Sequence, residues 1–318
     1  MRLLRRHPFD VLLDAMRRLF PEEFIEATLR LFATVGTWGL YGAMALWLLF
    51  SVVVSLRSGS FFELWAGLLS VVLLVILEYA GRRFGRALDH LNRATSTHVA
   101  STAFLDCFAL FGILIAVVGL IGLGWIAVRI EAYLWMFPAA MIFVVCLAAA
   151  IMAVNPDWLS VTVAPQTTPG QELVGIVSFL MKLGAGIVPV VFGAGVAWGT
   201  LELLYACFLA IAPPGEPPAG FAPQLSNGRG LIGLGELQGP AAPDTIRMLP
   251  ALEVASRART VLFLMAALPV LMYFAFLFYY LALDVLQAVL SLPLKLDRLA
   301  TSEGRTEREA DAEDDLPT

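Results

Sequence analysis

Six long runs of apolar residues, separated by polar breaks, dominate the pattern along the chain. The runs cover residues 33–56, 62–81, 101–128, 132–154, 186–212 and 259–287. Each reaches or exceeds the length of about 20 residues that an α-helix needs to cross about 30 Å of hydrocarbon. A helix also satisfies its own backbone hydrogen bonds, which lipid cannot do. The pattern therefore predicts an all-α integral membrane protein, a bundle of six transmembrane helices.

The first 32 residues form two similar short units, Pro8–Phe20 and Pro21–Phe32. Each opens with Pro and acidic residues and ends with Arg before a Leu-Phe pair, which is typical of a helix start and a helix end. Apolar residues follow one face of each unit. We therefore expect amphipathic N-terminal surface helices that lie on the cytoplasmic side of the membrane. A helical pair packed against other protein is the alternative.

Three further segments complete the predicted organisation. Residues 213–257 are rich in Pro and Gly and should form an outer loop, and residues 293–318 should form an acidic cytoplasmic tail. The fifth run is unusual because apolar residues begin near Leu173, too early for one span. We predict a separate interfacial or cytoplasmic helix over 172–183 and a span from 186, with a broken or re-entrant helix as the alternative.

The basic residues predict the orientation of the bundle. Residues 1–32, residues 82–100 and the segment after 290 hold fourteen Lys or Arg, against six on the opposite side. Cytoplasmic segments carry the excess of Lys and Arg. Both termini should therefore be cytoplasmic, and an Arg-rich N-terminus that is not cleaved fits a bacterial inner membrane.

Composition narrows the possible chemistry. The chain is 59% hydrophobic and 15% charged with a net charge of −5, so no basic field favours nucleic acid. The three Cys and three His form no metal-binding motif, and the His lie in or beside cytoplasmic segments. The sequence thus predicts no metal, no cofactor and no recognisable catalytic group. The expected partners are the lipid bilayer and other integral membrane proteins or copies of this chain.

Glu202 is the main candidate for an intramembrane polar site. It falls near the middle of the predicted fifth span, with Trp198 and Tyr205 on the same helical face. A charged carboxylate at that depth is unfavourable, so we expect it to be protonated, hydrogen-bonded or in contact with water. A hydrogen bond between helices, a proton- or ion-handling role and a contact with another subunit all remain open.

Other charged residues and glycines also suggest contacts. Lys182 and Asp284 form a candidate ion pair at the cytoplasmic boundary, although snorkelling to the interface is the alternative for each. Glu78 and Arg82 are one helical turn apart and should pair. Small residues let membrane helices approach closely. The glycines expected at helix contacts are Gly112, Gly119, Gly195 and Gly199.

These patterns favour a non-catalytic integral membrane subunit or scaffold that packs with other membrane proteins. The competing hypothesis is a small proton- or ion-coupled transporter or channel that uses Glu202.

Overall fold

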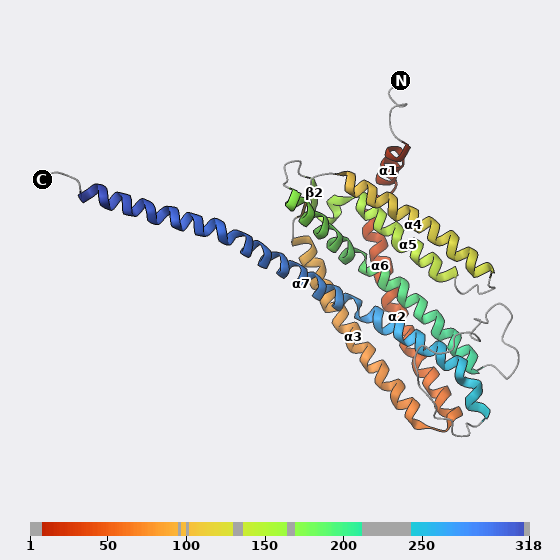
Figure 1. Ribbon diagram of the computed structural model, residues 1–318. Helices are drawn as coiled ribbons and strands as arrows, with labels where there is room; N and C mark the ends of the chain where they lie inside the picture. Colours follow the sequence, from red (N-terminus) through yellow and green to blue (C-terminus); the bar gives the residue numbers. More distant parts are fainter. Residues whose placement is uncertain are drawn as a thin grey trace. The chain divides into compact units, whose positions relative to one another are not determined.

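The structure, a computed structural model, describes residues 8–94, 97–99, 102–129, 136–163, 169–211 and 243–314 (Figure 1). Its α-helices are α1 (Pro8–Leu19), α2 (Glu22–Ser58), α3 (Phe61–Ala94), α4 (Thr102–Arg129), α5 (Met136–Val154), α6 (Pro169–Ile211) and α7 (Pro243–Asp314). A 3-10 helix, η3 (Pro156–Leu159), and two short strands, β1 (Thr97–Val99) and β2 (Val161–Val163), complete the fold. The strands pair in parallel, with His98 opposite Thr162.

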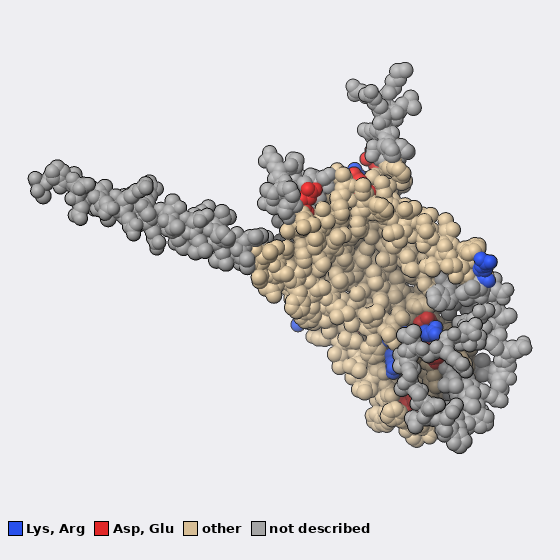
Figure 2. Space-filling view, viewed as in Figure 1, with Lys and Arg blue, Asp and Glu red and all other residues tan. Residues whose placement is uncertain are grey.

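Six helices among the described residues are long and apolar enough to cross a membrane, as predicted, although several of their bounds differ from those of the predicted runs. They are Glu22–Ser58, Phe61–Arg93, Thr102–Arg129, Met136–Val154, Glu172–Ile211 and Pro250–Leu286. Figure 2 shows that almost all of the described surface on the face drawn lacks charged side chains. Many large apolar side chains are exposed, among them Trp65, Phe111 and Ile121. Such a surface is expected where lipid is the solvent.

The chain divides into two compact units after residue 273. The first, Met1–Tyr273, contains the helices from α1 to α6 and the first part of α7. The second, Phe274–Thr318, is the remainder of the chain and is described by itself. Within it, the ring of Tyr280 contacts those of Phe276 and Tyr279, at centroid distances of 4.7 and 5.1 Å.

Helices α2 and α6 form the centre of the first unit. Half of the most apolar part of α6 and 44% of that of α2 are buried, against 11% for α3 and 17% for α4. One cluster of buried residues joins α2 and α6 to α3 and α7, and includes Leu40, Leu74, Leu203 and Leu262. A second cluster joins α1, α4, α5 and the first half of α6.

The N-terminal prediction needs a correction. Residues 21–32 do not form a separate surface helix, because α2 starts at Glu22 and continues without a break to Ser58. Pro21 and two acidic residues favour the start of this helix, and no residue near position 32 interrupts it. Helix α1 is separate and buries Leu13 and Met16 in the second cluster. Its placement on a membrane surface stays a prediction.

The predicted break in the fifth run is also absent. Helix α6 is continuous over 43 residues and contains Pro189 in its interior. A proline inside a helix is unfavourable by about 3 kcal/mol. Neighbours on both sides compensate, since Phe179 and Leu183 are buried before the proline and Val190 and Val196 after it. Packing against other helices therefore overrides the local propensity.

Helix α7 extends into both the predicted outer loop and the predicted tail. Residues 212–242, most of the predicted loop, lie outside the described residues, but residues 243–257 belong to α7. This part of α7 is amphipathic, and Ala251, Val254, Ala255 and Ala258 are buried at helical spacing. The helix also continues through most of the predicted tail to Asp314. Glu and Arg, which are frequent there, are good helix formers.

Candidate functional site

The strongest candidate site in the described part of the chain is a cavity of about 360 Å³ between α2, α3, α6 and the first part of α7. Sites for small molecules typically have volumes of about 300–1,000 Å³. We call it the α2–α3 cavity. Its walls are mainly apolar and include Leu29, Ala33, Leu88, Val188, Phe192 and Ala266. Sequence reasoning did not predict it.

Small residues create the space. Gly81 and Gly85 face α7, because a Cβ atom added to Gly81 would lie 3.2 Å from the carbonyl oxygen of Ala266. A Cβ at Gly85 would meet only Pro269, at 3.9 Å. On the facing wall, Ala185 and Gly186 bring the α6 backbone to the cavity. The Gly-x-x-x-Gly spacing of Gly81 and Gly85 was a signal in the sequence, but it does not identify the helix that it faces.

Three pairs of acidic and basic side chains line the same cavity. Arg30 donates a hydrogen bond to Glu26 at 2.7 Å on α2. On α3, Arg93 donates to Asp89 at 3.3 Å, and Arg82 pairs with Glu78, as the sequence predicted. The exposure of these side chains differs widely within the cavity lining: the Arg30 side chain is 79% exposed. The Glu78 side chain is only 10% exposed. The cavity therefore combines apolar walls with charges of both signs.

Trp158 of η3 forms another part of the wall. Its ring lies 3.0 Å from the position of a Cβ atom at Gly186, so a glycine there lets the ring approach α6. The segment that carries Trp158 is held by Lys182 of α6. The Lys182 ammonium donates hydrogen bonds to the carbonyl oxygens of Leu159 at 3.0 Å and Ser160 at 3.3 Å. Lys182 is fully buried. Its hydrogen bonds hold the segment that forms one side of the cavity.

Pro189 interrupts the backbone hydrogen bonds of α6 at the cavity wall. In a regular helix, the N–H of residue 189 would donate to the carbonyl oxygen of Ala185, but proline has no N–H. Both Ala185 and Pro189 line the cavity. The carbonyl group of Ala185 therefore lacks the donor that a residue other than proline would supply at position 189.

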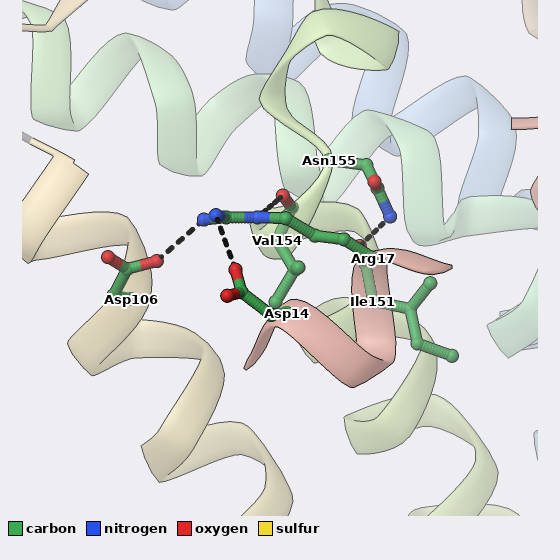
Figure 3. Close-up of polar contacts among 6 residues, drawn as sticks. All are labelled: Asp14, Arg17, Asp106, Ile151, Val154 and Asn155. Atoms are coloured by element: carbon green, nitrogen blue, oxygen red, sulfur yellow. Dashed lines mark hydrogen bonds and ion pairs between the residues drawn. The ribbon is translucent and has the colours of Figure 1, made fainter. Parts of the chain in front are cut away.

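A polar cluster beside the second cluster of buried residues holds α1 in place (Figure 3). The guanidinium of Arg17 lies between Asp106 of α4 and Asp14, with N–O distances of 3.0 and 3.8 Å. Arg17 also donates to the carbonyl oxygen of Val154 at 3.2 Å. Asn155 donates to the carbonyl oxygens of Ile151 and Phe20. Every group points toward a protein partner, so this cluster acts as a structural clamp.

Glu202 lies outside the α2–α3 cavity. One of its carboxylate oxygens, Oε2, is buried and accepts no hydrogen bond from the described residues. The sequence identified no cation in another span at its depth, but Arg257 of α7 exerts an attractive coulombic effect on it. Arg257 also donates a hydrogen bond to Glu253 at 2.6 Å. Since α6 is much longer than one span, the place of Glu202 in the helix does not fix its depth.

The two aromatic neighbours of Glu202 have separate surroundings. Trp198 stacks on Phe137 of α5, with ring centroids 5.8 Å apart and an interplanar angle of 19°. Tyr205 packs against the first cluster of buried residues. The structure therefore places both rings in contacts between helices, and a shared site with Glu202 stays a prediction.

The other predicted residues lie apart from the cavity or outside its unit. A Cβ at Gly112 would lie 3.2 Å from Ala150 of α5, and one at Gly119 would lie 3.6 Å from Ile142. Gly195 and Gly199 face Met265 and Leu262 of α7. Asp284 is exposed and belongs to the second unit, so its pairing with Lys182 stays a prediction.

The described residues contain no group of three or more His, Cys, Asp or Glu side chains that could hold a metal ion. Comparisons of the chain with protein-family models, with curated proteins and with solved structures found no match.

Proposed function

We propose that the protein is an integral membrane protein that binds an amphiphilic molecule in the α2–α3 cavity. The observation that carries this proposal is the combination, in one cavity, of apolar walls and three charged pairs. An apolar ligand would cover the charged pairs without offering them a polar contact, and a fully polar ligand would leave apolar walls without an apolar contact. An amphiphile matches both.

The location supports a ligand that reaches the cavity from the membrane or its surface. The cavity lies toward the start of α2 and the end of α3, which the distribution of basic residues predicts to be cytoplasmic. Apolar helices surround it, so a ligand with acyl chains would remain in contact with lipid while its headgroup meets the charged pairs. A bilayer phospholipid is the simplest probe of this kind.

Gly85→Leu should block the cavity, because the new side chain would extend into open space beside Pro269. We expect native mass spectrometry of the full chain in detergent to show about tenfold lower occupancy by added dimyristoyl phospholipid. Gly42→Leu is the matched control, since it makes the same change in a helix with no atom within 4 Å of the new Cβ. Equal occupancy in Gly85→Leu and the wild-type protein would contradict the proposal.

The sequence-based expectation of a membrane subunit or scaffold remains a second proposal. It is favoured by α4, where Cβ atoms added to Gly122 and Gly124 would meet nothing within 4 Å. Glycines with open space beside them leave room for another helix to approach. Purification in a mild detergent tests this role: a stoichiometric partner or a defined oligomer is expected, and a lone monomer would count against it.

The transporter alternative rests on the buried Oε2 atom of Glu202. If this carboxyl group couples ion movement to transport, Glu202→Gln should abolish proton-driven flux in proteoliposomes while the protein stays folded. Glu253→Gln changes a carboxylate on the neighbouring helix and serves as the control. Unchanged flux of any identified substrate in Glu202→Gln would exclude this coupling role.

A further inference from the structure

A second candidate binding site lies on the exposed side of α3, away from the α2–α3 cavity. We infer that Tyr79, Arg83 and Arg86 bind the phosphodiester headgroup of an anionic phospholipid, such as phosphatidylglycerol. We call these three residues the α3 basic face. The inference does not depend on what occupies the cavity. It is carried by the exposure of the three side chains, by the pairing of the charges along α3 and by the apolar residues that adjoin them.

Helical geometry places the α3 basic face opposite the buried side of the helix. Successive residues of an α-helix are about 100° apart, so Tyr79, Arg83 and Arg86 share one face. Gly81 and Leu88 lie on the opposite face and are buried. All three side chains of the basic face are exposed. A ligand can therefore reach them from outside the helix bundle.

The charges along α3 are only partly compensated. Four arginines and two acids lie between residues 78 and 93. Each acid pairs with one arginine, and the pairs are Glu78 with Arg82 and Asp89 with Arg93. Neither Arg83 nor Arg86 forms an ion pair with any acidic side chain that the structure describes. The Nε atom of Arg86 donates only to the carbonyl oxygen of Arg82, at 3.3 Å. Two guanidinium groups one helical turn apart thus carry positive charge without a carboxylate.

The same face of α3 is apolar on the other side of Tyr79. Val72 and Ile76 precede Tyr79 at helical spacing, and both side chains are exposed. In a helix apolar enough to span a membrane, such side chains meet acyl chains. A tyrosine ring with a polar hydroxyl suits the junction between lipid and water. A ligand on this face therefore meets apolar contacts and positive charge in sequence, as a phospholipid requires.

Aromatic residues of α2 support this level as a membrane boundary. The Nη2 atom of Arg82 donates a hydrogen bond to the Tyr41 hydroxyl at 2.7 Å and so joins α3 to α2 beside the basic face. The ring of Trp38 contacts that of Tyr41 at a centroid distance of 6.3 Å, and both side chains are exposed. Trp and Tyr are enriched where a membrane meets water. The α3 basic face thus lies at a level where lipid phosphate groups are expected.

The chemistry of the α3 basic face favours an anionic headgroup over a zwitterionic one. Guanidinium groups donate pairs of hydrogen bonds to phosphate oxygens, and the Tyr79 hydroxyl is a further donor. A zwitterionic headgroup would add a cation to a face whose only charged groups are basic. The two nearby carboxylates, Glu78 and Asp89, already pair with other arginines. Phosphatidylglycerol has the phosphodiester without the added cation.

Native mass spectrometry of the full chain in detergent tests this inference with dimyristoyl phosphatidylglycerol and dimyristoyl phosphatidylcholine. Each basic residue near an anionic lipid surface strengthens binding about fivefold, so we expect the wild-type protein to prefer phosphatidylglycerol by about ten- to thirtyfold. Arg83→Gln with Arg86→Gln should remove most of this preference. Arg83→Lys with Arg86→Lys keeps the charge and should keep phosphatidylglycerol as the preferred lipid. No preference in the wild-type protein, or an equal preference in the glutamine variant, would overturn the inference.

A matched control removes the same charge elsewhere. Arg57→Gln with Arg129→Gln changes two exposed arginines at the ends of α2 and α4 and should keep the wild-type preference. If this control loses the preference as fully as the glutamine variant at 83 and 86, net charge is the cause, and the site on α3 is excluded.

Two further measurements separate this site from the cavity and from a site for soluble anions. Gly85→Leu, on the cavity side of α3, should lower total phospholipid occupancy and keep the preference for phosphatidylglycerol. Loss of the preference in this variant would place the anionic lipid in the cavity and overturn the inference, while the proposed function stands. Unchanged occupancy would overturn the proposed function alone. Glycerophosphoglycerol, the headgroup without acyl chains, should not displace the lipid at equal concentration, and displacement would overturn the assignment to a lipid.

Discussion

Gly193→Ala is expected to destabilise the protein strongly, by about 3 kcal/mol or on the order of 10 °C in the midpoint of thermal unfolding. The reason is a close approach of the backbones of α2 and α6. An added Cβ atom would overlap the carbonyl oxygen of Phe32 and would lie 3.0 Å from its carbonyl carbon. Backbone atoms inside a long helix cannot move aside alone, so the two central helices would have to separate.

On α2, the residue at this contact is also a glycine, Gly36. A Cβ atom at Gly36 of α2 would lie 3.0 Å from the Cα atom of Gly193 and would overlap the ring of Phe192. Two glycines therefore let the central helices meet along their backbones. Phe192 also lines the α2–α3 cavity, so separation of the helices should alter the cavity as well.

Matched glycines test whether the backbone contact is the cause. Gly42→Ala on α2 meets no atom within 4 Å and should be neutral or slightly stabilising, because Ala is the better helix former by about 1 kcal/mol. Gly195→Ala would meet the flexible side chain of Met265 and should have an intermediate effect. The midpoint can be followed by size-exclusion chromatography of heated samples in detergent. An alanine at 193 that is as stable as one at 42 would contradict the contact.

The sequence identified the elements of this fold better than their junctions. Length and hydrophobicity are local properties, so all six apolar helices were predicted. The continuity of α6 through Pro189 was not, because it depends on neighbours that bury residues on both sides of the proline. The start of α7 was missed for a related reason: charged residues such as Arg257 hide an amphipathic helix when only apolar runs are counted.

The candidate site was harder to predict than the fold. The pairing of Glu78 with Arg82 follows from their spacing on one helix and was correct. That Glu26 and Arg30 line the same cavity depends on the hairpin register of α2 and α3 and on the small residues of α6 and α7. The sequence shows the spacing within each charged pair, but it does not show that the pairs line the same cavity. Glu202 stands out in the sequence because it is an isolated acid in an apolar run, whereas the residues of the cavity look ordinary one by one.

The wall that carries Trp158 links stability to binding through Lys182. Its ammonium group donates to two carbonyl oxygens in the segment that follows α5, and Ser160 adopts a left-handed conformation there with φ of 53°. This geometry turns the chain so that Trp158 precedes the turn and β2 follows it. Because Lys182 is fully buried, water cannot replace its hydrogen bonds without opening the structure.

Lys182→Ala should therefore destabilise the protein by about 3–5 kcal/mol, since it removes both the hydrogen bonds and the packed side chain. Lys182→Met keeps a chain of similar length and should lose about 1–3 kcal/mol, the effect of leaving buried carbonyl groups without a donor. The difference between the two variants in thermal unfolding separates packing from hydrogen bonding. Lys182→Met should also weaken lipid binding, because the segment bearing Trp158 loses its anchor. A methionine variant with wild-type stability and wild-type binding would show that Lys182 does not position this wall.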